Sequence, residues 1–210
     1  MIKNILFDFD GVILDSMKIR TDGFREIFSN FQKNDVDMLV DFHNKNGGLS
    51  RYIKIEYFFK RILNQEIDVE KINEIAARFS EIMRYKLTDK RLLIEPTINF
   101  IEKNYKAFNF HIVSGSDQDE LRFLCEKLKL RDYFVSIFGS PTVKDDLVAN
   151  IIKSHSYKNS ETVIIGDSIN DLNAAEKNKI KFFGFNNPNL KEKSDKYIEN
   201  YNLIFQSLSK

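Results

Sequence analysis

Residues that mark several other classes of protein are scarce in this sequence. Its 210 residues include no tryptophan, three prolines and one cysteine. A single cysteine excludes an internal disulfide and fits a reducing compartment, so we expect a cytoplasmic protein. No signal peptide is expected before the first strand-like run. No apolar run is long enough to span a bilayer, so no membrane partner is expected either.

The sequence also has almost no net charge. The chain carries 32 basic and 31 acidic residues, for a formal net charge of +1. A nucleic-acid partner is therefore not expected, because such partners select a strongly basic face. Hydrophobic residues make up 42% and charged residues 30%, which is typical of a globular protein with a substantial core.

Short apolar runs that alternate with helical patterns are what the sequence does have. The predicted strands are Ile2–Phe9, Phe108–Val113, Tyr133–Phe138, Thr162–Ile165 and Lys181–Phe185. The predicted helices between them are Pro96–Lys103, Asp117–Leu130, Asp145–Ser154 and Asp171–Asn178. This alternation indicates an α/β fold, with a Rossmann-like parallel sheet flanked by helices. The tail, Ser194–Ser209, is expected to add a short strand and a helix.

A long helical segment separates the first predicted strand from the second. Its apolar residues, such as Phe24, Ile27 and Phe28, recur at helical spacing. We therefore expect a small all-α cap domain over residues 16–88, inserted into a core domain formed by 1–15 and 89–210. Gly47 and Gly48 interrupt the helices of the insert, and Ser50 is expected to cap the helix that follows.

Two aspartates, Asp8 and Asp10, follow the first apolar run and precede Gly11. On a strand their side chains project to the same side. Two neighbouring carboxylates repel each other unless a cation or a shared proton relieves them, so stability alone does not favour them. Gly11 permits a sharp turn and a close approach of a ligand to the backbone N–H groups. Taken alone, these residues fit a polar Asp-Gly turn equally well.

Polar residues follow the other predicted strands as well. In an open parallel sheet, ligands bind beyond the carboxyl ends of the strands. Together these ends supply four carboxylates, a hydroxyl and a lysine, which suit a phosphate and a divalent cation; beside Asp8 and Asp10 they are Ser114, Lys144, Asp167 and Asp171. Taken singly, Ser114 fits a helix cap, Lys144 a solvated helix start and Asp171 an exposed helix residue.

The order of these residues resembles the four motifs of the haloacid dehalogenase (HAD) superfamily. The matching residues are Asp8-Phe9-Asp10-Gly11-Val12, Ser114, Lys144 and Gly166–Asp171. The resemblance covers the whole chain. The place of the helical insert is similar to that of the cap in the subgroup of phosphoglycolate phosphatases and β-phosphoglucomutases.

The resemblance implies a role for each of these residues. Asp8 is the expected nucleophile and Asp10 the general acid and base. Phosphate is expected on the backbone or side chains of Phe9, Asp10, Ser114, Gly115 and Lys144. Mg²⁺ is the expected cofactor, held by Asp8, Asp167 and the backbone carbonyl of Asp10, with Asp171 behind them or bound through water.

The reaction implied by the resemblance is hydrolysis of a small phosphate monoester. Asp10 favours this, because the dehalogenases and phosphonatases of the family lack an acid at its position. A sugar phosphomutase remains an alternative, since it shares every core residue. A non-catalytic, receiver-like signalling module is an alternative of another class, although such modules are shorter and carry their paired acids side by side.

The insert is expected to select the substrate. Arg51 follows the glycine pair and is expected to reach a substrate group, as are Gly48, Ser50 and His43, with Lys45 and Arg20 less favoured; a surface arginine is an equal alternative for Arg51. An enclosed site favours a small phosphorylated metabolite. The loop is similar to that of HAD phosphatases encoded among surface-polysaccharide genes, which suggests a sugar or polyol phosphate. We expect a monomer or weak dimer.

Overall fold

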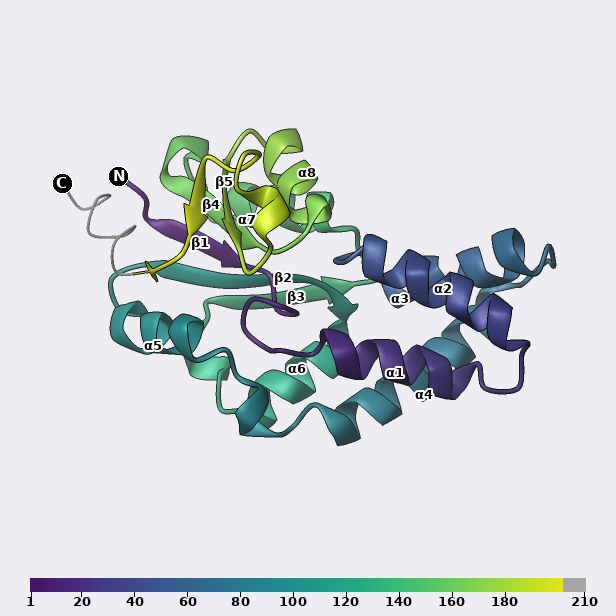
Figure 1. Cartoon of the computed structure of the whole chain (residues 1–210). Coiled ribbons are helices and arrows are strands. Elements are labelled where there is room, and N and C mark those ends of the chain that lie inside the picture. The colour runs from purple at the N-terminus through teal and green to yellow at the C-terminus, as the bar shows by residue number, and fades with distance from the viewer. Residues whose placement is uncertain (202–210) are drawn as a thin grey trace.

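The computed structural model describes residues 1–201, and a six-stranded parallel sheet lies at its centre (Figure 1). The strands are β1 (Asn4–Phe7), β2 (Asn109–Asp117), β3 (Ser136–Ser140), β4 (Thr162–Gly166), β5 (Lys181–Phe185) and β6 (Lys196–Ile198). Their order in the sheet is β3-β2-β1-β4-β5-β6, and every neighbouring pair is parallel. The expected α/β, Rossmann-like fold is confirmed.

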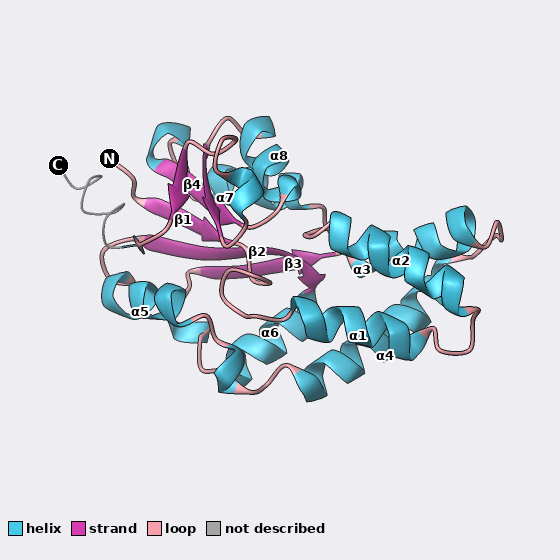
Figure 2. Ribbon diagram, viewed as in Figure 1, coloured by secondary structure: helices cyan, strands magenta, loops and turns pink. Residues whose placement is uncertain are grey.

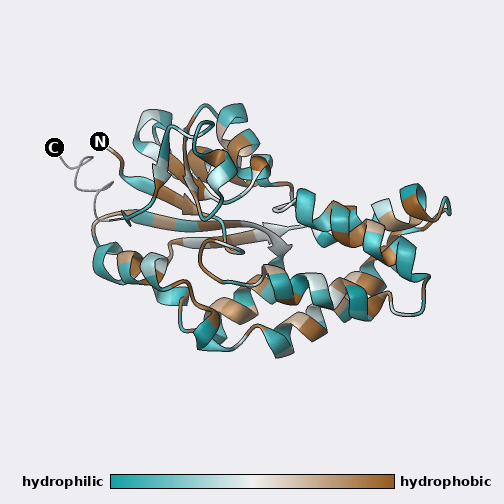
Figure 3. Ribbon diagram, viewed as in Figure 1, coloured by the Kyte–Doolittle hydropathy of each residue, from teal (hydrophilic) through white to brown (hydrophobic). Residues whose placement is uncertain are grey.

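Helices cover both faces of the sheet (Figure 2). They are α5 (Glu95–Asn104) and α6 (Gln118–Lys127) on one face, and α7 (Lys144–Ser154) and α8 (Ile169–Lys177) on the other. Along β1, Ile5 and Phe7 join the core that contains Leu121, whereas Leu6 joins the core that contains Leu147. Side chains of a strand alternate between faces, so an unbroken apolar strand serves both cores. Figure 3 shows brown, hydrophobic segments along the central strands and on the helices that flank them.

Several element boundaries differ from those predicted. The strand expected over Tyr133–Phe138 begins only at Ser136, because Arg131–Tyr133 form a 3₁₀ turn. Helix α6 ends at Lys127, since Lys129 adopts a positive φ of 62° that a helix does not accommodate. Strand β6 lies within the expected tail; the helix expected after it lies outside the described residues.

The insert between β1 and β2 is helical, as predicted. It consists of α1 (Met17–Ile27), α2 (Lys33–Lys45), α3 (Arg51–Tyr57) with a π-helical continuation (Phe58–Ile62), and α4 (Val69–Lys86). In Figure 1 these helices lie beyond the end of the sheet at which β2 and β3 finish. Ser50 caps α3 as expected, its side chain accepting a hydrogen bond from the Ile53 N–H at 3.4 Å.

The two connections between the insert and the sheet run side by side. The Asp15 N–H donates to the Leu92 carbonyl at 2.8 Å, and the Ile94 N–H donates to the Ile13 carbonyl at 2.9 Å. The division into a core domain (1–15 and 89–210) and a cap domain (16–88) stays a prediction. No helix within residues 1–201 is both long and apolar enough to cross a membrane.

Candidate active site

The central strands bring the predicted site residues together at one end of the sheet. The chain moves outward from β1 through β2 to β3, and then returns to β4 on the opposite side of β1. Ligands of open α/β sheets bind at this point of reversal, beyond the carboxyl ends of the strands. Asp8 directly follows β1, and Asp167 directly follows β4. Their proximity is therefore a consequence of the strand order.

Three carboxylates and one ammonium group form an acidic centre there. Asp8, Asp167 and Asp171 each offer an oxygen, and these oxygens lie within 4.8 Å of one another. The Lys144 Nζ lies 3.0 Å from Asp8 Oδ1 and 2.5 Å from Asp171 Oδ1. With all four groups charged, the centre carries a net charge of −2, which a divalent cation balances. Carboxylate oxygens are the ligands that Mg²⁺ prefers.

The pKa values of the acidic centre reflect this unbalanced charge. Burial, followed by the nearby Asp171, raises the pKa of Asp8 to about 7. Burial, followed by Asp8, raises the pKa of Asp167 to about 8. For Lys144, burial opposes the charged form, but Asp171 and Asp8 outweigh it and raise the pKa. The lysine therefore stays protonated, and the remaining repulsion among the carboxylates calls for a further cation.

A glycine allows Asp167 its position in the acidic centre. Gly11 has a φ of +77°, and a Cβ there would lie 2.0 Å from Asp167 Oδ2. Any other residue at position 11 would suffer backbone strain and displace the carboxylate. Glycine is therefore needed after Asp10 for two reasons: the positive φ of the turn and the lack of space for a side chain beside Asp167.

Asp171 is fixed by two sets of hydrogen bonds. Ser168 donates to Asp171 Oδ2 from its Oγ at 2.6 Å and from its N–H at 3.1 Å, completing a capping box at the start of α8. The other oxygen, Oδ1, pairs with Lys144. Both residues are buried, so the exposed alternatives for Asp171 and Lys144 are wrong. Lys144 is nevertheless the first residue of α7, as expected.

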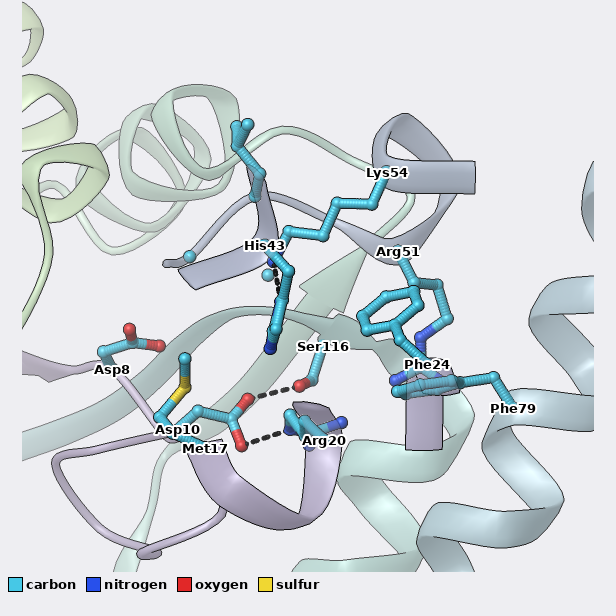
Figure 4. A pocket seen from close by; sticks show the side chains of 13 residues that line it. Asp8, Asp10, Met17, Arg20, Phe24, His43, Arg51, Lys54, Phe79 and Ser116 are labelled. Atoms are coloured by element: carbon cyan, nitrogen blue, oxygen red, sulfur yellow. Dashed lines mark hydrogen bonds and ion pairs between the residues drawn. The ribbon is translucent and has the colours of Figure 1, made fainter. Parts of the chain in front are cut away.

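Asp10 points away from the acidic centre toward the helical insert (Figure 4). Its Oδ1 accepts hydrogen bonds from Arg20 Nε at 2.6 Å and from the Ser16 hydroxyl, and its Oδ2 accepts one from Ser116 Oγ at 2.5 Å. Burial opposes ionisation of Asp10, but Arg20 and these hydrogen bonds outweigh burial and lower its pKa. Asp10 is therefore held as a carboxylate.

Glu120 of α6 joins two arginines of the insert. Its Oε1 accepts from Arg20 Nη1 at 2.9 Å, and its Oε2 accepts from Arg51 Nη1 at 2.6 Å. Arg51 also donates to Ser80 Oγ at 2.7 Å, and its guanidinium lies 4.7 Å from the ring centroid of Phe79. The surface alternative for Arg51 is therefore wrong. Its guanidinium is engaged with Glu120, which links α1 and α3 to α6.

A narrow cavity between the insert and the strand ends connects these groups. It is lined by Asp8, Asp10, Met17, Arg20, Phe24, His43, Gly48, Leu49, Arg51, Lys54, Phe79, Gly115 and Ser116. Several predicted site residues lie outside this lining: Ser50 and Lys144 line an adjacent cavity, whereas Phe9, Ser114, Asp167 and Asp171 line neither of the two.

The glycine loop of the insert packs directly on the core. A Cβ on Gly115 would lie 2.1 Å from the Gly48 carbonyl oxygen, and Asn170 Nδ2 donates a hydrogen bond to the Gly47 carbonyl. Gly48 itself has a φ of +80°, and a Cβ there would lie 2.9 Å from Ser168 Oγ. The loop thus covers the site by a backbone-to-backbone approach that requires glycine on both sides.

Two predicted phosphate ligands are engaged within the protein. The Phe9 N–H donates to Asp8 Oδ1 at 2.7 Å, and Ser114 Oγ accepts from the Ser116 N–H at 3.1 Å. The cap of α6 is Asp117, so the interpretation of Ser114 as a helix cap is wrong.

Sequence reasoning missed Ser116, Glu120 and Lys54, and it gave Arg20 little weight. A signal existed for Lys54: Arg51, Lys54, Ile55 and Phe58 follow the spacing of one helix face, and all four are buried.

Comparisons with known proteins agree with this geometry. The family model described as haloacid dehalogenase-like hydrolase matches residues 5–185. Among curated protein sequences, none matches this chain.

Solved structures with the same fold cover nearly the whole chain. A β-phosphoglucomutase from Clostridium difficile is 16% identical with a TM-score of 0.78, and the match covers 100% of this chain and 96% of that one. A predicted phosphatase from Clostridium acetobutylicum is 17% identical with a TM-score of 0.77, covering 99% of both chains. The Bacillus subtilis protein YfnB, described as bound to magnesium, is 16% identical with a TM-score of 0.73, covering 100% of both chains.

Proposed function

This chain belongs to the haloacid dehalogenase-like hydrolase family, and from that premise we propose that it is a Mg²⁺-dependent phosphatase of small phosphate monoesters. The observation that carries the proposal is the acidic centre: when ionised, Asp8, Asp167 and Asp171 outweigh Lys144 by two negative charges at the strand ends. A phosphate dianion approaches such a centre only if a cation is present. The residues therefore suit a site that takes a divalent cation and a phosphate together.

The residues that would hold Mg²⁺ are Asp8, Asp167 and the backbone carbonyl of Asp10, with Asp171 held behind them by Lys144 and Ser168. When bound, the ion supplies positive charge to the phosphoryl oxygens and lowers the repulsion between phosphate and carboxylate. The raised pKa values of Asp8 and Asp167 support this, because burial and mutual repulsion are what a cation relieves.

Asp8 acts as the nucleophile in the proposed reaction. One of its oxygens forms a bond to phosphorus while the bond from phosphorus to the alcohol oxygen breaks, which leaves an aspartyl phosphate. Water then attacks phosphorus, and inorganic phosphate leaves as the Asp8 carboxylate is restored. Lys144, 3.0 Å from Asp8, offsets negative charge on the carboxylate and the phosphoryl oxygens in both steps.

Asp10 moves the protons. It protonates the departing alcohol oxygen and later accepts a proton from the attacking water. In the present arrangement its carboxylate is ionised and bound by Arg20, Ser16 and Ser116, which is the form that accepts a proton. To serve first as an acid, Asp10 has to take up a proton and give up hydrogen bonds to these residues. Ser114, Gly115 and the backbone of Phe9 and Asp10 complete the proposed phosphate site.

The proposed substrate is a small metabolite phosphate. The cavity under the insert is narrow and lined by side chains of the insert as well as the core, so one ligand of limited size contacts both. The loop at Gly47–Arg51 favours a sugar, polyol or similar phosphate of the kind used in surface-polysaccharide synthesis. Catalysis in a cytoplasmic monomer or weak dimer completes the proposal.

Hydrolysis of p-nitrophenyl phosphate tests the proposed function. We expect turnover with Mg²⁺, none after chelation, and a loss of about 10⁴-fold in the Asp8→Asn variant, because its amide is not a nucleophile. Asp22→Asn, on the exposed surface of α1, is the matched control and should retain full activity. A receiver-like binding module would show no turnover under any of these conditions.

A further inference from the structure

The cavity contains buried hydrogen-bond donors for which residues 1–201 supply no acceptor. Arg20 and His43 are 5% and 2% exposed, yet Arg20 Nη2 and His43 Nε2 have no hydrogen-bond partner among the described residues. Both residues line the cavity. Figure 4 shows a ring nitrogen of His43 pointing into the space above Asp10 and Ser116. Buried polar groups are usually satisfied, so these two atoms indicate a missing ligand.

Lys54 fixes the protonation of the histidine. Its Nζ lies 2.9 Å from His43 Nδ1, and the ammonium form of Lys54, which a bound anion would favour, can only donate. His43 Nδ1 is therefore the acceptor, and the ring proton sits on Nε2, facing the cavity. Burial, followed by the charge of Lys54, lowers the pKa of His43 to about 3, which keeps the ring neutral. His43 Nε2 is thus a donor, as is Arg20 Nη2.

Lys54 is also a buried amine without an anion of its own, and burial, followed by the charge of Arg20, lowers its pKa to about 7. It is 4% exposed, and within the described residues its Nζ forms a hydrogen bond with His43. The other charges in contact around the cavity pair off, since Arg20 and Arg51 are matched by Asp10 and Glu120. When Lys54 is protonated its charge is therefore unpaired among the described residues, and a bound anion would favour that protonated form. Buried charges are normally paired, so the cavity lacks one negative charge as well as acceptor oxygens.

We propose that His43 and Lys54, with Arg20 as a third donor, form a binding site for a carboxylate on the alcohol part of the substrate. The inference rests on the proposed phosphatase function and narrows its substrate class to phosphorylated hydroxy acids or sugar acids. Because Asp8 lines the same cavity, a single ligand can place its phosphate at Asp8 and its carboxylate at Lys54.

The charge distinguishes a carboxylate from other acceptor groups. A neutral hydroxyl would satisfy the donors but leave Lys54 uncompensated. A second phosphate, as a dianion, would add a surplus negative charge beside Asp10. A carboxylate brings one charge and two acceptor oxygens, which match one surplus cation and the converging donors.

Paired substrates that differ only in the carboxylate test the proposal. D-3-phosphoglycerate is compared with glycerol 3-phosphate, and 6-phosphogluconate with glucitol 6-phosphate, by phosphate release with Mg²⁺. We expect kcat/KM for the acid to exceed that for the alcohol by at least about tenfold in one or both pairs, since burying a charged group beside its partner is worth that much. Fructose 1,6-bisphosphate, measured in the same assay, tests whether a second phosphate is preferred to a carboxylate.

Substitutions at Lys54 and His43 test whether these residues cause the preference for the acid. Lys54→Met should lower kcat/KM for the preferred acid by about 30-fold or more, bringing the acid-to-alcohol ratio near one. His43→Phe, which keeps the ring that packs on Phe24, should lower the same ratio by about fivefold. Lys54→Arg keeps the charge and should retain part of the ratio. Lys60→Met, at an exposed lysine of the π-helical turn, is the control and should leave the ratio unchanged.

The outcomes separate this inference from the proposed function. If p-nitrophenyl phosphate and all five esters are inert, the phosphatase proposal fails and this inference fails with it. If p-nitrophenyl phosphate is hydrolysed but neither acid is preferred, or the bisphosphate is preferred to both, only the carboxylate site is overturned. An acid preference that survives in a folded Lys54→Met variant also overturns it.

Discussion

Two charged regions face each other across the cavity, and they differ in sign. At the strand ends, Asp8, Asp167 and Asp171, when ionised, outweigh Lys144 by two negative charges. Under the insert, when Lys54 is protonated, the three cations Arg20, Arg51 and Lys54 outweigh Asp10 and Glu120 by one positive charge. The first region calls for a cation and the second for an anion. In the proposed function, the core therefore binds the phosphate and the insert binds the alcohol part of the substrate.

Asp10 joins the two regions, and its removal should have the largest effect. Asp10→Asn takes away the proposed acid and base but keeps the size of the side chain. We expect kcat to fall by about 10³-fold, within the range for general acid–base catalysis. Steady-state kinetics on p-nitrophenyl phosphate measure this, with Asp41→Asn on the exposed face of α2 as the control. Full activity in Asp10→Asn would contradict the proposed role.

Glu120 pairs with both arginines of the positive region, so its replacement should lower the stability of the fold. Glu120→Gln leaves Arg20 and Arg51 buried without their shared anion. We expect the free energy of unfolding to fall by about 3–5 kcal/mol, as for other broken buried ion pairs. Denaturant titration provides the measurement. The matched control is Glu126→Gln, at an exposed position of the same helix, which should change stability little.

The contact between the two regions at the glycine loop should be sensitive to a single methyl group. In Gly115→Ala the new Cβ meets the Gly48 carbonyl at 2.1 Å, and the loop has to move off the core. We expect a loss of about 1–3 kcal/mol in stability, together with a higher KM. Gly47→Ala is the control, because its Cβ would find only an ordinary contact at 3.5 Å from Ser168. Equal effects in both variants would argue against a tight contact.

The smallest expected effect is a pH dependence of the negative region. The pKa values of Asp8 and Asp167 are raised in the folded protein to about 7 and about 8, so the folded state binds more protons than the unfolded state above pH 4. Without metal, stability should therefore fall as pH rises from about 4 to about 8. Thermal melting should show Mg²⁺ raising Tm by more at pH 8 than at pH 5, by about 2–4 °C. An equal shift at both pH values would contradict the charge argument.

The negative region could be anticipated from the sequence, whereas most of the positive region could not. Asp8 and Asp167 each follow an apolar strand, and parallel strands bring their carboxyl ends to one edge. Their closeness needed only the alternation of strands and helices. Glu120 and Arg20 are 100 residues apart and meet only once α1 packs near α6, which no local pattern encodes.

Charged residues on apolar helix faces were a signal that the sequence interpretation did not use. Lys54 shares a face with Ile55 and Phe58, and Glu120 directly precedes buried Leu121. A charge at such a position is costly unless a partner meets it in the folded protein, so each marks a tertiary ion pair or a ligand. The partner itself stays unknown until the helices are placed.

Reductive trapping of the acyl phosphate tests the central claim most directly. Enzyme turning over p-nitrophenyl phosphate with Mg²⁺ is quenched with sodium borohydride, which converts an aspartyl phosphate to homoserine, and its peptides are mapped by mass spectrometry. The account predicts homoserine at position 8, absent when either Mg²⁺ or the ester is omitted. Release of phosphate with residue 8 unmodified throughout, or with the modification at another aspartate, would contradict it.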